Sequence, residues 1–232
     1  SSVFAGSIDY LSNQSAKYLM TFHRTASTDA SADIANYNPA GTAFLAQGFY
    51  IDVSNQTLFK PYETETSGSA AAALSTLGFT LSTLGFKDEY SQSEPTILLP
   101  NVYAVYNFVQ IGAGKLAVYG QLGVSAGGGT LKWDDGTAAT FGALLGIFGG
   151  ANSDKPIKLT KNYFEASSAY YTFNAGVSYA FLDDMVSASV GGKVIMAKRS
   201  LTVEGAGYDL KSNPVQTYTL KGEYDYNATG YT

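Results

Sequence analysis

A serine set between glycines is the closest match to a catalytic motif. The stretch Gly123-Val124-Ser125-Ala126-Gly127 fits the nucleophile-elbow pattern, in which a tight turn between a strand and a helix exposes the serine. That arrangement needs a histidine after the serine, but His23, the only histidine, lies upstream. Ser125 also runs into the glycines at 127–129, which are poor helix formers. We therefore expect no catalytic residues and a protein that is not an enzyme.

Two other patterns resemble cofactor and metal sites. Residues 112–117, Gly-Ala-Gly-Lys-Leu-Ala, look like a dinucleotide fingerprint, but a strand pattern follows where a helix N-terminus would have to hold the pyrophosphate. They predict a hairpin turn instead. Asp134-Asp135 and Asp183-Asp184 are adjacent carboxylates in predicted turns, where we expect solvated side chains; a weak external cation at Asp134-Asp135 is the alternative. One histidine and no cysteine cannot build a zinc site, so we expect no metal and no cofactor.

The composition favours a β-rich chain with one polar and one apolar face. Charged residues make up 14% of the chain, against about 25% in ordinary soluble domains. There are 18 tyrosines and 25 glycines. The net charge of -5 argues against nucleic acid as a partner, because a phosphate binder needs a basic patch. The sequence contains no run of 18 apolar residues, so it predicts no transmembrane helix. Membrane-spanning strands give a much weaker signal and are not excluded.

Alternation of apolar and polar residues predicts six strands. A strand points successive side chains to opposite faces, so residues 170–181 place Tyr171, Phe173 and Val177 on one face and polar or small residues on the other. The predicted strands cover residues 48–60, 98–109, 115–125, 170–181, 186–203 and 217–229. In residues 186–203 the apolar positions change parity after Met196, which predicts a bulge near Ala197.

The connections between these strands alternate between short and long. A few residues join the second strand to the third and the fourth to the fifth, whereas the links at 62–97, 126–167 and 204–214 are long. Outer-membrane barrels have short periplasmic turns and long extracellular loops, and their strands are apolar outside and polar inside. The fold class we predict is therefore all-β, a transmembrane antiparallel β-barrel with strands over residues 42–232.

Two cations of the fifth predicted strand are candidates for contacts in the lumen. Lys193 lies on the polar face, whereas Arg199 lies where the apolar positions change parity. Both are expected to set the electrostatics of the lumen and to anchor the leader that precedes the first strand. A carboxylate-binding role for either residue is the alternative.

Two of the long loops carry apolar segments that need a partner. Leucines at 74, 77, 81 and 84 have the spacing of one helix face, and a second apolar run covers residues 141–148. One interpretation is a groove for a hydrophobic ligand; the other is that the two segments pack on each other and cap the barrel. The groove interpretation selects Leu74, Leu77, Phe79, Leu81, Leu84, Phe86, Phe141, Leu144, Leu145 and Phe148.

A polar, turn-rich leader precedes the first strand. Residues 6–41 are mostly small and polar, and they end in the turn Asn38-Pro39-Ala40-Gly41, because proline disfavours helix in the residue before it and cannot donate to a ladder. Such a leader needs a surface to pack against, and the polar lumen would provide one. Residues 1–5 resemble the remnant of a signal-peptide cleavage site, with an ordinary N-terminus as the alternative.

With these features in view, the chain resembles the outer-membrane long-chain fatty acid and aromatic hydrocarbon transporter family (FadL-like). The similarity is strongest over residues 29–55, centred on Asn38, Pro39, Ala40 and Gly41. It continues more loosely through residues 100–103, 113–128 and 173–198.

The resemblance implies a 14-stranded barrel whose N-terminal segment forms a hatch in the lumen, here residues 6–41. It also implies that ligand lands in an external groove, moves to an inner pocket and leaves through a gap in the wall beside a kinked strand. Six strands cannot close a barrel, for which about eight is the practical minimum. We therefore expect a partial barrel, an N-terminal portion of a longer protein.

The function we expect is passive uptake of long-chain fatty acids or other hydrophobic small molecules through the bacterial outer membrane, gated by the hatch. The expected partners are these ligands, membrane lipids and lipopolysaccharide, and the oligomeric state stays open. One alternative is a barrel that does not transport, such as a scaffold, a surface antigen or a secretion-system subunit. A soluble lipid-binding β-sheet protein is a third interpretation.

Overall fold

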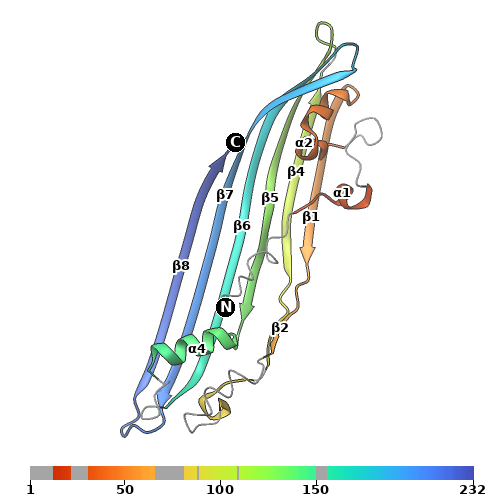
Figure 1. Ribbon diagram of the computed structural model, residues 1–232. Coiled ribbons are helices and arrows are strands. Elements are labelled where there is room, and N and C mark those ends of the chain that lie inside the picture. Colours follow the sequence, from red (N-terminus) through yellow and green to blue (C-terminus); the bar gives the residue numbers. More distant parts are fainter. Residues whose placement is uncertain (1–12, 22–30, 66–80, 88, 109, 150–155) are drawn as a thin grey trace.

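One long antiparallel sheet dominates the chain. The computed structural model describes residues 13–21, 31–65, 81–87, 89–108, 110–149 and 156–232. The strands of the sheet are β1 (Gly48–Leu58), β4 (Thr96–Asn107), β5 (Lys115–Trp133), β6 (Ile157–Phe181), β7 (Val186–Asp209) and β8 (Thr217–Tyr231). Figure 1 shows these six strands side by side in the order in which they occur in the chain, with β1 and β8 at the two edges. Each strand is hydrogen-bonded to the strands beside it.

All six strands correspond to strands predicted from alternation, but three are longer than predicted. β5 continues to Trp133 and β6 begins at Ile157. The two extensions pair with each other, from Gly129 with Ser168 to Trp133 with Phe164. The third extension takes β7 to Asp209, paired with the start of β6. In these extensions both faces carry a mixture of polar and apolar residues, so alternation alone does not reveal them.

The predicted bulge near Ala197 is wrong. Ala197 pairs with Tyr170 on one side and with Ala228 on the other, in an unbroken register. The apolar residues change parity because the covered face changes. Val203 packs against a buried apolar cluster, several of whose side chains belong to a helix that covers the sheet. Met196 lies on the opposite face of the sheet and is exposed. The irregularities lie elsewhere: in β6 between Leu159 and Lys161, in β5 between Val124 and Gly129, and in the pairing of β1 with β4 between Gln56 and Leu58.

Short elements surround the sheet. In the first long link, β2 (Tyr62–Glu65) pairs with β3 (Glu89–Gln92), and the 3-10 helix η3 (Leu81–Leu84) lies between them in the chain. The second long link contains helix α4 (Ala138–Ile147). The leader and the residues after it form α1 (Ala16–Thr21), α2 (Ile34–Tyr37) and the 3-10 helix η2 (Pro39–Phe44). Among the described residues, no helix has the length and apolar character that crossing a membrane would require.

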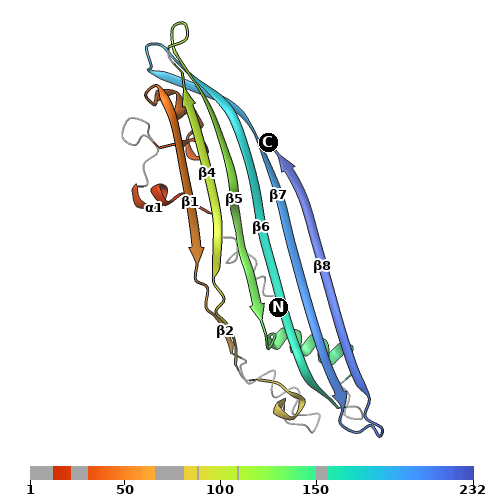
Figure 2. The same cartoon turned by 180° about the vertical axis from the view of Figure 1, so that it is seen from behind.

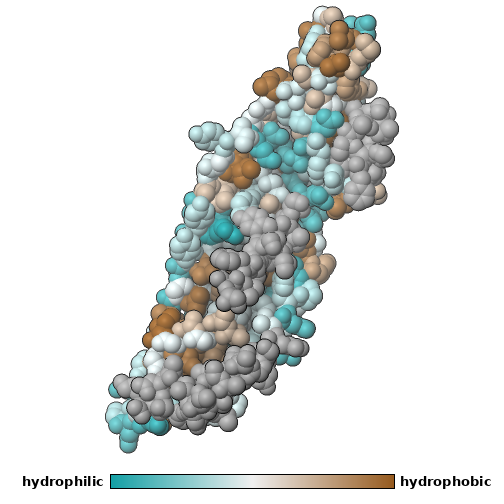
Figure 3. All heavy atoms as spheres, viewed as in Figure 1, coloured by the Kyte–Doolittle hydropathy of each residue, from teal (hydrophilic) through white to brown (hydrophobic). Residues whose placement is uncertain are grey.

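The sheet has two different faces, which we call inner and outer. The inner face is the one that η2 and α4 cover. The Thr42 hydroxyl lies 2.5 Å from that of Ser178, and a Cβ on Gly205 would lie 2.4 Å from Leu144 of α4. Figures 1 and 2 show α2 and α4 on the same side of the strands, and none of the helices in the described residues covers the other side. Figure 3, which views the inner face, shows hydrophilic side chains across its middle and hydrophobic ones gathered near α4.

The outer face carries an apolar belt next to a charged zone. The belt consists of the outward side chains within residues 49–53, 98–106, 116–124, 171–181 and 186–196. Its side chains are apolar yet solvent-facing: Leu122 is 61% exposed and Phe173 52%. Towards the long-link end the outward residues become charged, including Lys132, Glu165, Lys198, Glu204, Lys221, Glu223 and Asp225.

Two buried clusters hold the covering elements to the inner face. The first joins the leader to β4 and β5 and contains Ala32, Ile34, Ala35, Leu45, Tyr103, Val105, Ala117 and Tyr119. The second lies at the long-link end and contains Leu84, Phe141, Leu144, Leu145, Ile157 and Leu159. We call this second group the cap cluster.

Candidate functional site: a groove on the inner face

A groove of about 470 Å³ lies on the inner face around Arg199. Register explains its position, because residues paired across neighbouring strands share a face. Arg199 is paired with Ser168 of β6 and Tyr226 of β8, and Ser168 is paired with Gly129. The next row towards the cap cluster contains Leu131, Ala166, Leu201 and Tyr224.

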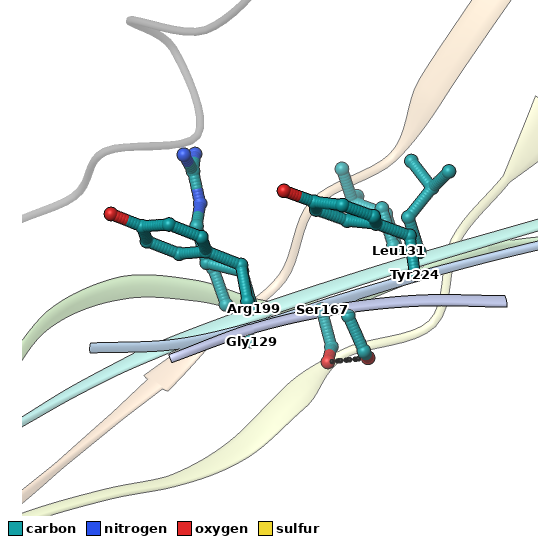
Figure 4. A pocket seen from close by; sticks show the side chains of 10 residues that line it. Gly129, Leu131, Ser167, Arg199 and Tyr224 are labelled. Carbon is teal, nitrogen blue, oxygen red and sulfur yellow. Dashed lines mark hydrogen bonds between the residues drawn. The ribbon is translucent and has the colours of Figure 1, made fainter. Parts of the chain in front are cut away.

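The groove combines one cation with an apolar floor. Figure 4 shows Arg199, Tyr224 and Leu131 projecting from the same side of the sheet. A guanidinium binds carboxylates through paired N–H donors, and tyrosine rings offer large apolar faces. The volume lies within the range of about 300–1,000 Å³ that is usual for small-molecule sites. The arrangement therefore suits an amphipathic molecule with an anionic end and an apolar body.

Lys193 does not belong to this groove. It is paired with Asn174, six residues from Arg199 along β7, which corresponds to about 20 Å along a strand. The two cations considered from the sequence thus share the inner face but are not brought together.

The turn predicted at Asn38-Pro39-Ala40-Gly41 begins η2. The Asn38 side chain accepts a hydrogen bond from the Gly41 N–H at 3.4 Å, as an N-cap residue does. A Cβ on Gly41 would lie 2.9 Å from both Ile34 and Asn38, so a larger residue would push these side chains away. The turn therefore needs glycine at its fourth position for close packing.

Asn107 of β4 anchors this turn to the sheet. Its Nδ2 group donates to the carbonyl oxygens of Thr42, Ala43 and Leu45, at 3.0, 3.1 and 2.8 Å. Asn107 is fully buried. One amide thus contacts three carbonyl groups at the end of η2, where helical carbonyls lack partners within the helix. The Thr42 oxygen also accepts from the Leu45 N–H, at 3.3 Å.

Polar contacts hold the earlier part of the leader. The Ser31 hydroxyl donates to Asp52 of β1 at 2.7 Å, and the Ser15 hydroxyl donates to the buried carboxylate of Asp33. The rings of Tyr18 and Tyr37 stack at 4.4 Å. The leader therefore contacts the sheet through hydrogen bonds as well as through its apolar cluster.

The ladder between β4 and β5 stops part of the way along these strands. The strands are paired from Asn107–Ala117 to Asn101–Gly123, and Pro100, which has no N–H, comes next. Beyond that point Asn13 of the leader joins them. Its Nδ2 donates to Leu99 O at 2.6 Å and to Val124 O at 2.7 Å. A leader side chain thus replaces strand pairing at this position.

The apolar loop residues selected from the sequence pack mainly on one another. Leu84 is buried against Phe141, Leu144 and Leu145 in the cap cluster, and Phe86 meets Phe141 edge to face at 5.0 Å. Phe148 packs against the same cluster and stacks on Tyr218. Leu81 begins η3. Leu74, Leu77 and Phe79 lie outside the described residues.

Residues that resembled catalytic or metal sites lie in ordinary strand and turn positions. Ser125 lies within β5, where its hydroxyl accepts from Thr172 at 2.5 Å and donates to the Tyr170 carbonyl. Asp134 pairs with Lys132 at 3.1 Å and Asp135 with Lys87 at 2.6 Å. No three His, Asp or Glu side chains come together as metal ligands in the described ranges.

The charged zone of the outer face, which lies beyond the apolar belt, contains linked ion pairs. Glu204 pairs with Lys161 and lies 3.8 Å from Lys221, which in turn pairs with Glu223 at 2.6 Å. The hydrogen bond from Lys161 lowers the pKa of Glu204, because it stabilises the ionised carboxylate. These charges therefore favour a solvated environment for this end of the sheet.

Comparisons with protein-family models, with curated proteins and with solved structures found no match for this chain.

Proposed function

We propose that this chain forms part of the wall of a bacterial outer-membrane β-barrel that takes up long-chain fatty acids or other hydrophobic small molecules. The leader would act as a hatch inside the lumen. The contrast between the two faces supports this proposal, because a membrane strand is apolar towards lipid and polar towards the lumen. Closure would require further strands beside β1 and β8, since about eight strands are the practical minimum.

The height of the apolar belt is the observation that carries the proposal. On β6 the belt runs from Tyr171 to Phe181, which is about 33 Å along a strand at about 3.3 Å per residue. A strand tilt of about 40° reduces this to about 25 Å across the bilayer, the usual height of the apolar band of a membrane barrel. Aromatic residues flank the band in such barrels, and Phe181 and Tyr171 occupy its two margins here.

The groove around Arg199 would bind the ligand inside the barrel. The carboxylate of a fatty acid would contact the guanidinium, and its chain would lie on Leu131, Leu201 and the ring of Tyr224. The interrupted ladder between β4 and β5, joined by Asn13, would provide a sideways exit once the leader moves. Movement along this path would need only differences in affinity, with no chemical step.

Fatty acid binding to the purified chain in detergent tests this role. Arg199→Gln should weaken binding of a fluorescent long-chain fatty acid by about 5- to 30-fold, since a charge-assisted contact in an open groove contributes about 1–2 kcal/mol. The same variant should bind the matching fatty alcohol as the unmodified chain does. Lys158→Gln, on the outer face, is the matched control. Equal losses for the acid and the alcohol would contradict a carboxylate contact at Arg199.

A barrel that does not transport is the second candidate, and the cap cluster favours it. Its apolar side chains are buried against one another, as expected for a lid with a structural role. If this candidate is correct, the chain will insert into bilayers but will bind neither fatty acid nor fatty alcohol at micromolar concentrations. Binding of both ligands would exclude it.

A further inference from the structure

The groove around Arg199 continues into an apolar track that leads to the cap cluster. The track consists of two rows of side chains on the inner faces of β5 to β8. The first row is Leu131, Ala166, Leu201 and Tyr224, and the second is Trp133, Phe164, Val203 and Gly222. Neither row contains a charged residue. Figure 3 shows hydrophobic side chains gathered in the same direction, near α4.

In the other direction from Arg199 the inner face becomes more polar. It carries Thr172 there and, in the row beyond, Gln121, Asn174 and Lys193. A hydrocarbon chain gains from leaving water only where it covers apolar surface. A fatty acid whose carboxylate contacts Arg199 would therefore extend its chain towards the cap cluster.

Leu144 of α4 closes the far end of the track. A Cβ on Gly205 would lie 2.4 Å from the Leu144 side chain, so this leucine rests on the backbone of β7. Leu220, which is paired with Gly205, packs against the cap cluster. A ligand chain that reached Gly205 would therefore have to displace Leu144.

Gly222 leaves the β8 side of the track free of a side chain. It is paired with Val203, and no described atom lies within 4 Å of the position of a Cβ on Gly222. Because alternate residues of a strand share a face, Gly222 lies on the same side of the sheet as Tyr224. A larger residue at position 222 would project over the track.

The register gives the length of the track. Gly205 lies six residues from Arg199 along β7, which is about 20 Å at about 3.3 Å per residue. Contact between a terminal methyl group and Leu144 takes about 4 Å of this distance. An extended acyl chain advances about 1.3 Å per carbon, because C–C bonds of about 1.5 Å form a zigzag, so the remaining length of about 16 Å holds about 12 carbons.

We propose that Leu144 and Gly222 set the length of acyl chain that the groove recognises, and that an unbranched carboxylate of about 12 carbons fills it. The carboxylate contacts Arg199, the chain lies across Leu201 beside the ring of Tyr224, and the terminal methyl group meets Leu144. Longer chains bind no more tightly, because their remaining carbons leave the track. The inference rests on the fatty acid binding proposed above and adds a limit of chain length to it.

Brominated dodecanoic acids test where the chain lies. Trp133, the only tryptophan, belongs to the second row of the track and lies four residues along β5 from Gly129, in the row of Arg199. At saturation in detergent, 12-bromododecanoic acid should quench Trp133 fluorescence at least three times more than 2-bromododecanoic acid, whose bromine lies next to the carboxylate. Equal quenching by the two acids would overturn the direction of the chain.

Binding of saturated acids of 8 to 16 carbons to glycine variants tests the length limit. Dividing each dissociation constant by that of the unmodified chain cancels the partition of the ligand into micelles. Gly222→Leu should weaken binding of the 12-carbon acid at least fivefold, since several carbons lose their apolar floor and each fully buried CH₂ group contributes about fourfold. The 8-carbon acid, which ends near position 222, should change less than twofold. Leu144→Ala, which removes the stop, should tighten binding of the 16-carbon acid at least twofold.

Gly230→Leu is the matched control. Gly230 lies on the same face of β8 but on the other side of Arg199, and no described atom lies within 4 Å of its Cβ position, so its replacement should change the binding of neither acid. A Gly222→Leu variant that weakens the 8-carbon and 12-carbon acids equally, or neither, would overturn the length limit while leaving fatty acid binding at Arg199 intact. An unmodified chain that binds none of the acids would overturn the proposed function as well.

Discussion

Replacing Gly176 with alanine should disturb the packing of Tyr119 on the inner face. A Cβ on Gly176 would lie 2.3 Å from the Tyr119 hydroxyl oxygen, 2.5 Å from its Cζ atom and 2.5 Å from the Val190 carbonyl oxygen. The same hydroxyl would lie 2.5 Å from a Cβ on Gly191 of the next strand. The tyrosine thus lies across two glycines, and because it is only 7% exposed, its ring has little room to move.

The expected cost comes from overpacking. Forcing extra volume into a well-packed site costs about 1–3 kcal/mol. Alanine also restricts the unfolded chain, which offsets about 0.4–1 kcal/mol. We therefore expect Gly176→Ala to lower the free energy of unfolding by about 1–2 kcal/mol.

Urea unfolding in detergent micelles measures this change, and Gly222→Ala is the matched control. Gly222 also lies in a strand, but a Cβ there meets nothing within 4 Å, so its replacement should be neutral or slightly stabilising. In a Tyr119→Leu background the cost of Gly176→Ala should be smaller, because the clash with the ring is gone and only the contact with the Val190 carbonyl oxygen remains. A Gly176→Ala variant as stable as Gly222→Ala, or one whose cost is unchanged in that background, would refute the reasoning.

Three further perturbations test other contacts. Asn107→Ala should lower stability by about 2–3 kcal/mol and make the leader more sensitive to protease, because the carbonyl groups of Thr42, Ala43 and Leu45 each lose the hydrogen bond from the Asn107 amide; an unchanged digestion pattern would contradict the anchoring role. Gly205→Ala should push Leu144 and α4 away from the sheet, since the new Cβ would lie 2.4 Å from the leucine; the fluorescence of Trp133, the only tryptophan, should then shift to the red, whereas no shift would mean that α4 is not held there. The lowered pKa of Glu204 means that its ion pair contributes stability above the ordinary glutamate pKa of about 4.3 and loses it as the pH falls through the lowered value; unfolding curves of Glu204→Gln should lack this acid-dependent loss, and identical pH profiles would contradict the assignment.

The strands could be predicted from the sequence because one of their faces is consistently apolar. Alternation located all six strands. In β1, β4, β5, β6 and β7 it reflects outward side chains that form the belt, whereas in β8 the apolar residues, such as Leu220 and Tyr224, lie on the inner face. It did not locate the ends of β5 and β6, where the outward residues are charged and the inward residues contact the groove or the cap cluster. Alternation of apolar and polar residues cannot identify a strand when the polarity of both of its faces changes along its length.

The parity change in β7 shows the same limit. A bulge and a change of covered face give the same sequence pattern, because both move apolar residues from one parity to the other. Only the register on both sides of Ala197 separates them. Val203 faces the cap cluster, which the sequence presents only as two distant apolar loop segments.

The groove was only partly predictable. Arg199 could be selected from the sequence as one of only two arginines, at the point in its strand where the apolar positions change parity. Its neighbours Leu131, Ala166 and Tyr224 come from three other strands, and only the pairing register places them in one row. The role of Asn13 had no sequence signal, because an asparagine in a polar leader is unremarkable until the strand ladder beside it stops.

Lipid exposure of single cysteines tests the central claim, that the apolar belt lies in a bilayer and the charged zone outside it. The chain contains no cysteine, so Val190→Cys in the belt and Glu223→Cys in the charged zone each provide one labelling position. After reconstitution into lipid vesicles, we predict that a water-soluble maleimide labels position 223 at least ten times faster than position 190. A fluorophore attached to position 190 in detergent before reconstitution should be quenched by brominated acyl chains. Equal labelling at the two positions, with no quenching at position 190, would contradict the account.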